Sequence, residues 1–444
     1  MISGLLARAA ALLPFFWTFS ACAQQDVSAG PSTGSRIAQA TVPADAGHDR
    51  LIQALGDARF VLLGESTHGT LEFYRERGRI SQRLAAERGF GAVLIEADWT
   101  PAFRVNRYVR GLGSDRSATE ALSSFENFPR WMWRNEQFRD FVEALRSWNL
   151  TQPPERRVGI YGHDVYDLFN AADTVIAYLR RTDPAAATRV ERHYGCFAAA
   201  RRDNQRYGEQ SRRRPCREDA EAALAEIQRL PSPQGMEAAE EHFGAVRSAA
   251  SVVAAEEYFR ESYSGSDSWN ARDRRMAANI EATAYHVGRL RGDGRGRVVA
   301  WAHNSHVGDA RATDVVRMGQ ITLGQAMRER HGQSVWLVGF LSYTGRVFAA
   351  PEWGEPGRVY EKRDAIRGSH SQLFHDLGLP DFLLLLRGNA ALAEELRAPR
   401  PQRMIGVVYA RDTERMSHYV EARLPEQFDA LFFFDATQAV MPLR

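Results

Sequence analysis

The sequence is almost without lysine, because Lys362 is the only lysine among 57 basic residues and all the others are arginine. A P-loop needs a lysine after its glycine-rich turn, and a Schiff-base enzyme needs a reactive lysine in its site. Both mechanisms are therefore excluded everywhere except at position 362. Net charge is also small, since 57 basic residues face 55 acidic ones and leave +2. A chain without a general basic field is not expected to have nucleic acid as its partner.

Long apolar runs are missing too, and no segment after the N-terminus approaches the ~20 residues of a membrane-spanning helix. Near the N-terminus, Arg8 precedes an apolar stretch at 9–19, and small residues surround Cys22. This is the pattern of a secretory signal over 1–23. Cleavage after Ala23 and lipidation at Cys22, within a sequence that resembles a lipoprotein box, both fit this pattern. We therefore expect export to the periplasm or outer cell envelope. Residues 24–45, rich in Ser, Gly, Pro and Ala, are expected to form a flexible tether.

Cysteine is scarce, with three residues in the whole chain. Once Cys22 belongs to the leader, Cys196 and Cys216 remain. Two thiols left over in an oxidising compartment usually pair. The sequence therefore predicts a disulfide between Cys196 and Cys216.

Short apolar runs alternate with amphipathic stretches along most of the chain. The runs that predict strands are 59–65, 92–98, 158–164, 297–304, 334–343, 381–386, 403–409 and 430–437. A helical pattern from Leu71 to Arg88 separates the first two runs, and roughly 184–290 has almost no strand signal. Continuous apolar strands with helical crossovers favour an α/β fold with a mostly parallel sheet flanked by helices. We expect residues 46–444 to form one catalytic domain with an α-helical insertion at about 184–290.

Ionisable side chains follow four of the predicted strands. The carboxyl ends of parallel strands meet at one edge of a sheet, where sites form. A strand-end His or Asp taken alone often serves only to cap the next helix. Four coinciding strand ends instead predict a general acid–base site, because a nearby carboxylate can tune His near neutral pH. The side chains are Glu65 and His68, Glu96 and Asp98, His163 and Asp164, and His303 and His306.

Several segments resemble the ordered motifs of the erythromycin esterase family. They are GESTHGTLEFYRERGRI (64–80), VLIEADW (93–99), YGHDVYDL (161–168), RDRRMAANI (272–280), WAHNSHV (301–307) and FDALFFFDAT (428–437). The resemblance runs from about residue 50 to the C-terminus. It implies a hydrolase that opens a macrolide lactone or cleaves a related ester by activating water, without a metal or other cofactor.

The same resemblance implies roles for six residues. They are His68 as essential histidine and general base, Glu65 and Glu96 as carboxylates of the site, Arg77 as an arginine near the reacting group, and His303 and His306 as paired histidines. The name of the family alone does not fix the substrate, because it includes members that do not hydrolyse macrolides.

Ester hydrolysis needs a base for water, a donor for the oxyanion and an acid for the leaving alcohol. His68 suits the base if Glu65 or Glu96 holds its tautomer. Two residues three apart on a strand face opposite sides, so His303 and His306 reach one site only if the chain has already left the strand. We therefore favour His303 over His306 as the acid or oxyanion donor.

Ser66 offers an alternative mechanism, because GESTHG lies on a strand-to-helix turn as a nucleophile elbow does. In that mechanism Ser66 is the nucleophile and His68 its base. The competing interpretation is that Ser66 and Thr67 cap the helix that begins near Leu71.

We expect further contacts to the substrate, a small-molecule ester or lactone, from the loops and the helical region. The predicted contact residues are Trp99, Asp164, Tyr258, Asp273 and Arg275. An aromatic stretch is expected either to floor a site for a bulky apolar ester or to belong to the core. Its members are Trp99, Phe125, Phe128, Trp131 and Trp133.

Two other function classes remain open from sequence. One is a metal-dependent hydrolase that uses H-x-x-H at 303–306 with His68, Glu65 and Glu96, although no H-E-x-x-H is present. The other is a non-enzymatic ligand-binding protein on the same scaffold. The sequence does not determine which ester is the substrate or what the oligomeric state is.

Overall fold

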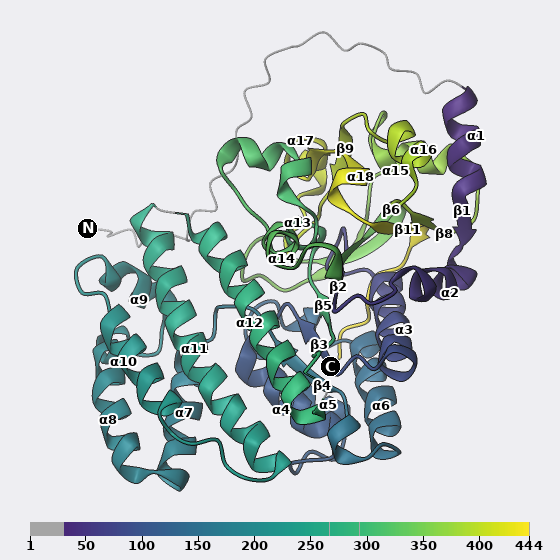
Figure 1. Ribbon diagram of the computed structural model, residues 1–444. Helices are drawn as coiled ribbons and strands as arrows, with labels where there is room; N and C mark the ends of the chain where they lie inside the picture. Colours follow the sequence, from purple (N-terminus) through teal and green to yellow (C-terminus); the bar gives the residue numbers. More distant parts are fainter. Residues whose placement is uncertain (1–30, 266, 293, 444) are drawn as a thin grey trace, which may run out of the picture.

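The computed structural model describes residues 31–265, 267–292 and 294–443. Within these ranges a nine-stranded sheet lies at the centre, with helices on both faces (Figure 1). Eight strands follow the order β1-β8-β11-β6-β2-β5-β3-β4, and β7 pairs with β6. The pairs from β11 to β4 are parallel, whereas β1, β8 and β7 pair antiparallel. The α/β class and the mostly parallel sheet are confirmed.

The strands are β1 (Thr41–Pro43), β2 (Phe60–Leu63), β3 (Ala92–Ile95), β4 (Gly159–Gly162), β5 (Val298–Trp301), β6 (Val335–Ala349), β7 (Arg358–Glu361), β8 (Phe382–Leu385), β9 (Arg400–Arg403), β10 (Tyr419–Ala422) and β11 (Ala430–Thr437). The helices before β5 are α1 (Pro31–Ala40), α2 (Ala44–Ala54), α3 (Leu71–Arg88), α4 (Trp99–Val109), α5 (Ala118–Leu122), α6 (Glu136–Leu150), α7 (Phe169–Thr182), α8 (Pro184–Tyr194), α9 (Asn204–Ser211), α10 (Arg217–Gln228), α11 (Met236–Ser264) and α12 (Ser268–Arg291). Those after β5 are α13 (Asn304–Val307), α14 (Leu323–His331), α15 (His370–His375), α16 (Ala390–Glu395), α17 (Glu414–Ser417) and α18 (Leu424–Gln427).

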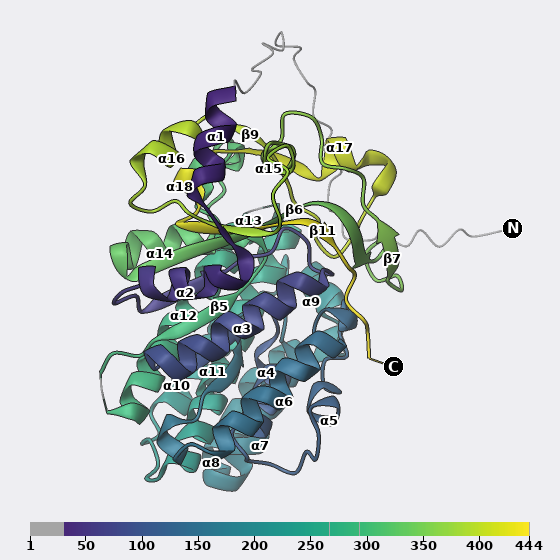
Figure 2. The same cartoon turned by 90° about the vertical axis from the view of Figure 1, so that its right-hand side faces the viewer.

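The inner strands β2, β3, β4 and β5 are buried along their whole length, which explains their continuous apolar sequences. In β2, Val61 faces the side on which Leu84 of α3 packs. Phe60 faces the opposite side with Ile280 of α12. Figure 2 shows α3 and α6 side by side on the first of these faces. Helices on both sides thus leave only the strand ends available for a site.

The predicted strand at 403–409 is wrong beyond its first residue. β9 ends at Arg403 and pairs with β10 in a separate two-stranded sheet. Beyond it, Ile405 pairs with Thr67 and Val408 with Ala350 through single bridges. Both flanks of β11 in the main sheet are occupied by β6 and β8, so this segment crosses the loop after β2 instead.

The helical insertion lies between β4 and β5 and forms a lobe beside the sheet (Figure 1). The predicted range 184–290 covers α8 to α12, and the lobe already begins with α7. Its helices share a core of their own, which includes Val175, Leu179 and Val252. α12 also packs against the sheet through Ile280. This helix therefore connects the lobe to the strands.

The expected tether differs from the structure in its second half. Residues 31–40 form α1, and β1 pairs antiparallel with β8 at one edge of the sheet. Ile37 is fully buried and Val42 packs on the core, so these apolar residues attach the segment. The expected leader at 1–23, with Cys22, lies outside the described residues. In the described ranges, no helix is both long and apolar enough to cross a membrane.

The predicted disulfide is confirmed between Cys196, which follows α8, and Cys216, which precedes α10. It closes a loop with a sequence separation of 20. Restricting a loop of that size in the unfolded chain stabilises the folded state by about 3 kcal/mol. We expect a Cys196→Ala, Cys216→Ala variant to lose about that much free energy of unfolding in urea, followed by circular dichroism. Reductant should destabilise the parent and leave the variant unchanged; an equal response of both would contradict the assignment.

Candidate active site

Buried ionisable side chains gather at the carboxyl ends of β2, β3, β4 and β5. The first turns of α12 complete the group from the lobe. His68 and Glu96 are each 6% exposed, so the cluster is almost closed to solvent. Its members are Glu65, His68, Glu96, Asp164, Arg272, Asp273, His303 and His306.

His68 is held by a carboxylate and an arginine behind it. Its Nδ1 donates to Glu65 Oε1 at 2.9 Å, and Glu65 Oε2 accepts from Arg77 Nη2 at 2.7 Å. The Arg77 guanidinium is fully buried between the rings of Tyr74 and Trp301, at 4.7 and 4.9 Å. Arg77 therefore lies behind Glu65, fixes that carboxylate and is linked to His68 through it. With its proton on Nδ1, His68 keeps the lone pair of Nε2.

The pKa of His68 is raised above its ordinary value. Burial by itself lowers this pKa, but the hydrogen bond with Glu65 and the negative charges of Glu96 and Glu65 raise it by more. The charges around His68 thus favour its protonated form. A group with this environment can take up a proton during a reaction.

Arg272 joins three of the strand ends. Its Nε and Nη2 donate to the two oxygens of Asp164 at 2.8 and 2.7 Å. Nη2 also donates to Glu96 Oε1 at 2.9 Å, and Nη1 donates to His306 Nε2 at 3.0 Å. The guanidinium lies over the ring of Tyr166 at 5.1 Å. Asp164 thus orients a neighbour, as expected, and the neighbour is Arg272.

The pKa of Glu96 lies far below its ordinary value. Burial raises it, but the charges that His306 and His68 carry when protonated, together with the guanidinium of Arg272, lower it by more. Glu96 therefore remains a carboxylate at neutral pH, and its charge acts on His68.

Sequence reasoning missed Arg272, although this residue begins the motif at 272–280. Arginines at 272, 274 and 275 fall within one helical turn, so the sequence alone does not show which of them faces the strands. Only the structure identifies Arg272, because the residues on either side of it, Ala271 and Asp273, are buried.

His306 is fully engaged by its neighbours. Its Nδ1 donates to Asp273 Oδ1 at 2.8 Å, while Nε2 accepts from Arg272. Asp273 Oδ2 accepts from the backbone N–H of Leu323 at 2.6 Å, and the ring of Trp269 stacks on His306 at 4.5 Å. Asp273, expected to contact substrate, instead fixes the tautomer of His306. His306 in turn positions Arg272.

His303 keeps one ring nitrogen without a partner. Its backbone N–H donates to Glu96 Oε2 at 2.7 Å; its Nδ1 lies 2.9 Å from the hydroxyl of Ser305 and accepts from the backbone N–H of the same residue at 3.3 Å. Its proton therefore sits on Nε2, which is buried and has no hydrogen-bond partner among the described residues. The ring lies 4.9 Å from that of His68. Burial first, and then the proximity of His68, hold the pKa of His303 well below its ordinary value.

The turn after β5 explains how both histidines reach one site. β5 ends at Trp301, and residues 304–307 form the short helix α13. The chain has therefore left the strand before His306, and this is what allows His303 and His306, three residues apart, to reach the same site.

Trp99 does not belong to the site. It is fully buried, its ring stacks on Tyr161 at 5.5 Å, and its Nε1 donates to the carbonyl of Gly244 in α11. As the first residue of α4, Trp99 faces the lobe rather than the strand ends. Its role is to join the lobe to the sheet.

Arg275 and Tyr258 do not touch the cluster at the strand ends directly. Arg275 pairs with Glu257 at 2.6 Å on the half-exposed side of α12. The ring of Tyr258 meets that of Tyr166 edge to face at 4.9 Å. Tyr258 thus supports the aromatic ring beneath Arg272.

Ser66 and Thr67 do not cap the next helix as expected. The residue before α3 is Thr70, and its side chain makes no capping hydrogen bond. The hydroxyl of Thr67 bonds to that of Thr70, while Ser66 Oγ is buried without a partner among the described residues. No hydrogen bond joins Ser66 to His68 in this part of the chain, because Nδ1 of His68 is taken by Glu65.

An aromatic rim lies beside the loop of His68 and consists of Phe128, Trp131, Phe348 and Trp353. The backbone N–H of Phe348 donates to Gly69 at 3.0 Å, and a Cβ on Gly69 would lie 1.8 Å from the Phe348 carbonyl oxygen. Trp131 packs on Phe348 at 5.3 Å, and Phe128 on Trp353 at 4.9 Å. Trp353 is 55% exposed, so the rim reaches the surface.

The rest of the expected aromatic stretch is buried. Phe125 lies in the core, and Trp133 Nε1 donates to the carbonyl of Glu96 at 3.1 Å. These two residues support the site and do not line it.

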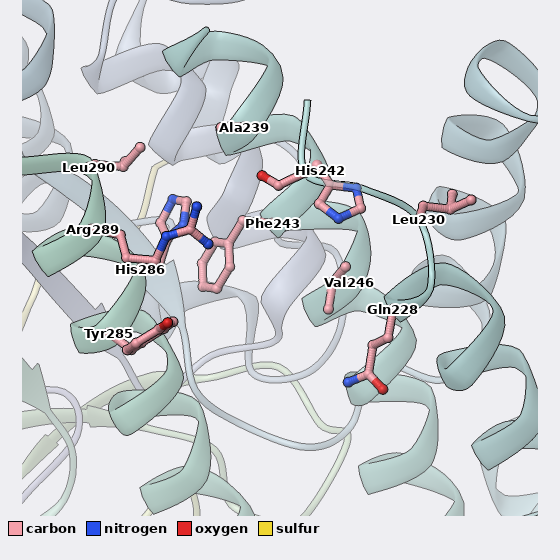
Figure 3. A pocket seen from close by; sticks show the side chains of 11 residues that line it. Gln228, Leu230, Ala239, His242, Phe243, Val246, Tyr285, His286, Arg289 and Leu290 are labelled. Atoms are coloured by element: carbon pink, nitrogen blue, oxygen red, sulfur yellow. The ribbon is translucent and has the colours of Figure 1, made fainter. Parts of the chain in front are cut away.

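No group of three His, Cys, Asp or Glu side chains in residues 31–265, 267–292 and 294–443 is arranged to hold a metal ion. The guanidinium of Arg272 lies among Glu96, Asp164 and His306 instead. A cavity of about 490 Å³ lies elsewhere, between α11, α12 and the end of α10 (Figure 3). Its lining includes His242, Phe243 and His286 and none of the residues of the cluster at the strand ends.

Comparisons with known proteins agree with this architecture. The family model for erythromycin esterase matches residues 85–437, a range that begins after the loop of His68. A solved structure described as a succinoglycan biosynthesis protein is 20% identical, with a TM-score of 0.75 over 94% of this chain and 100% of its own. A protein from Bacillus cereus is 18% identical, with a TM-score of 0.75 over 93% and 99%.

A mutant of the erythromycin esterase EreC, in its open conformation, is 18% identical to the chain. It has a TM-score of 0.61 and covers 88% of this chain and 93% of its own. At such identities the three structures show the shared fold.

Proposed function

The chain belongs to the erythromycin esterase family, and from that premise we propose that it hydrolyses a macrolide lactone or a related ester with an activated water molecule. The observation that carries the proposal is that two neighbouring histidines present Nε2 in different forms, one as an acceptor and the other as a donor. His68 has a free Nε2 lone pair beside two carboxylates, and His303 has an uncommitted Nε2–H. A base and a neutral donor side by side are what water attack on an ester requires.

His68 acts as the general base in this proposal. Its Nε2 takes a proton from water, and the resulting hydroxide attacks the ester carbonyl. The imidazolium that forms is stabilised by Glu65, at 2.9 Å, and by the charge of Glu96. His68 then returns the proton to the leaving alcohol, so that one group serves as base and acid in turn.

His303 supplies the donor for the oxyanion. Because its pKa is low, the ring is neutral and keeps the proton on Nε2. A neutral donor that is already oriented and desolvated stabilises developing negative charge without reorganising. His306 does not compete for this role, since both of its nitrogens are engaged.

Arg272 organises the site and takes the place that a cation would hold. Four of its five N–H groups are used on Asp164, Glu96 and His306. Because the guanidinium already neutralises these carboxylates, we propose that hydrolysis needs no metal. Activity that survives dialysis against a chelator would support this; activity restored only by added zinc would refute it.

The pH dependence of hydrolysis tests the role of Glu65. His68 must be neutral to act as base, so kcat/KM is expected to fall as the pH drops through the raised pKa of His68, above about 6.5. Glu65→Gln removes a hydrogen bond and a charge that raise this pKa. The acid limb of the pH–rate profile should therefore move to lower pH, with a lower maximal rate. Glu76→Gln, at the partner of buried His48, is the control and should leave the limb in place.

The aromatic rim favours a bulky apolar substrate. Trp353→Ala removes an exposed indole next to Phe128 and should raise KM for a 14-membered macrolide by about tenfold, the value of one partly buried aromatic contact. KM for a small aryl acetate should not change, since such an ester does not extend to the rim. Tyr285→Ala, an exposed aromatic of the lobe, is the matched control. A rise of KM for both substrates would exclude the rim as a specificity element.

The direct test of the function is a hydrolysis assay of the purified protein against macrolides and simple aryl esters. Mass spectrometry should detect a product heavier by one water for a lactone. If no member of the panel is turned over while one of them binds, the chain is a ligand-binding protein on this scaffold.

We propose further that the protein is exported. The leader-like sequence at 1–23 supports this, and so does the Cys196–Cys216 disulfide, because disulfides persist in oxidising compartments. Lipidation at Cys22 is the alternative to simple cleavage, and mass spectrometry of the mature N-terminus distinguishes them.

A further inference from the structure

The loop closed by the disulfide is unusually rich in arginine. Between Cys196 and Cys216 the chain carries six arginines and two acidic residues, in a protein whose net charge is only +2. We call residues 197–215 the arginine loop. The catalytic cluster uses none of these arginines.

The arginines of this loop point into solvent and are mostly without counter-charges. All six are exposed. Arg202 pairs with Asp173 at 2.8 Å, whereas the other five have no carboxylate within 4.0 Å among the described residues. Asp203 accepts from backbone N–H groups at the start of α9, so it neutralises no guanidinium. The five are Arg201, Arg206, Arg212, Arg213 and Arg214.

The backbone under these side chains is firmly anchored. Besides the disulfide, buried Tyr207 donates to Glu256 at 2.8 Å and accepts from the N–H of Cys216 at 3.1 Å. Asn204 donates to the carbonyl of Tyr166, the residue beneath Arg272, at 3.1 Å. Figure 1 shows α9 at the outer edge of the lobe, away from the sheet. The loop therefore presents a fixed cationic surface.

We propose that the arginine loop docks the protein on an anionic phospholipid surface. Guanidinium groups bind phosphate oxygens bidentately, and clustered basic residues are drawn to anionic lipid headgroups. The two aromatic rings of the loop, Phe197 and Tyr207, are buried, so it offers no platform on which nucleic-acid bases stack. No large apolar side chain of residues 197–215 is exposed, and the contact is therefore electrostatic, without insertion.

This docking is independent of the proposed hydrolysis. The variant Arg212→Glu, Arg213→Glu, Arg214→Glu reverses the charge on three exposed side chains at the end of the loop. A basic residue near an anionic surface contributes about fivefold in affinity, so the triple variant should bind about a hundredfold more weakly. Cosedimentation of the full chain with phosphatidylcholine vesicles containing about one third phosphatidylglycerol measures this.

The control variant is Arg116→Glu, Arg358→Glu, Arg397→Glu, which changes net charge equally at exposed positions outside the arginine loop. It should bind nearly as the parent does, and binding of the parent should vanish in pure phosphatidylcholine and at high salt. Circular dichroism and ester hydrolysis in solution should be unchanged in both variants. Equal loss in both variants, no binding of the parent, or tighter loop-dependent binding to single-stranded DNA than to the vesicles would overturn the proposal.

Discussion

Replacement of His68 by asparagine is expected to lower kcat/KM for ester hydrolysis by about 10³- to 10⁴-fold, because one side chain serves as base and then as acid. Asparagine can still donate an N–H to Glu65, so the buried carboxylate keeps a partner. The loss should therefore appear in kcat, with little change in stability. Initial rates on a lactone and on an aryl ester measure it.

His48→Asn is the matched control for this substitution. His48 of α2 forms a second buried pair with a glutamate, at 2.9 Å from Glu76 of α3, and does not follow a strand of the site. This variant should lose stability and keep kcat/KM within about twofold in the folded fraction. Equal losses of activity in both variants would mean that His68 acts only through folding.

Replacement of Arg272 by alanine is expected to cost both stability and catalysis. Glu96 and Asp164 would remain buried without the guanidinium that neutralises them, a situation that destabilises by about 3–5 kcal/mol. The pKa of Glu96 should rise, because Arg272 is one of the charges that lower it. Urea denaturation and kcat measured on the same preparation should fall together.

Arg275→Ala provides the comparison on the same helix. The Arg275–Glu257 pair is half exposed, and such surface pairs contribute about 0–1 kcal/mol. Arg272→Lys should be intermediate, since lysine keeps the charge but cannot bind Asp164 through two parallel N–H groups. If Arg272→Ala is as stable as Arg275→Ala, the guanidinium does not hold the site together.

The strand-end residues could be predicted because their positions follow from local sequence. Glu65, Glu96 and His303 come directly after continuous apolar strands, and parallel strands bring their ends to one edge. The disulfide followed from counting cysteines. These inferences did not depend on how distant parts of the chain pack.

The sequence does not show features that depend on how distant parts of the chain pack together, such as the direction of a helical side chain or the partner of a strand. The sequence does not show the phase of α3, so the position of Arg77 behind Glu65, between the rings of Tyr74 and Trp301, could not be predicted. Arg272 was missed because its direction depends on how α12 docks on the strands. The segment after Arg403 reads as a strand but finds the loop at Thr67 as its partner.

The order of strands has a consequence for synthesis on the ribosome. β5 lies between β2 and β3 in the sheet, yet it is made roughly 200 residues after β3, or about 10–40 s later. During that interval both edges of β2 and one edge of β3 lack their partners, and apolar unpaired edges promote aggregation. The helical lobe, α7 to α12, is synthesised during the same interval. Insertion of β5 between β2 and β3 therefore also brings His303 to His68, before β6, β8 and β11 complete the sheet.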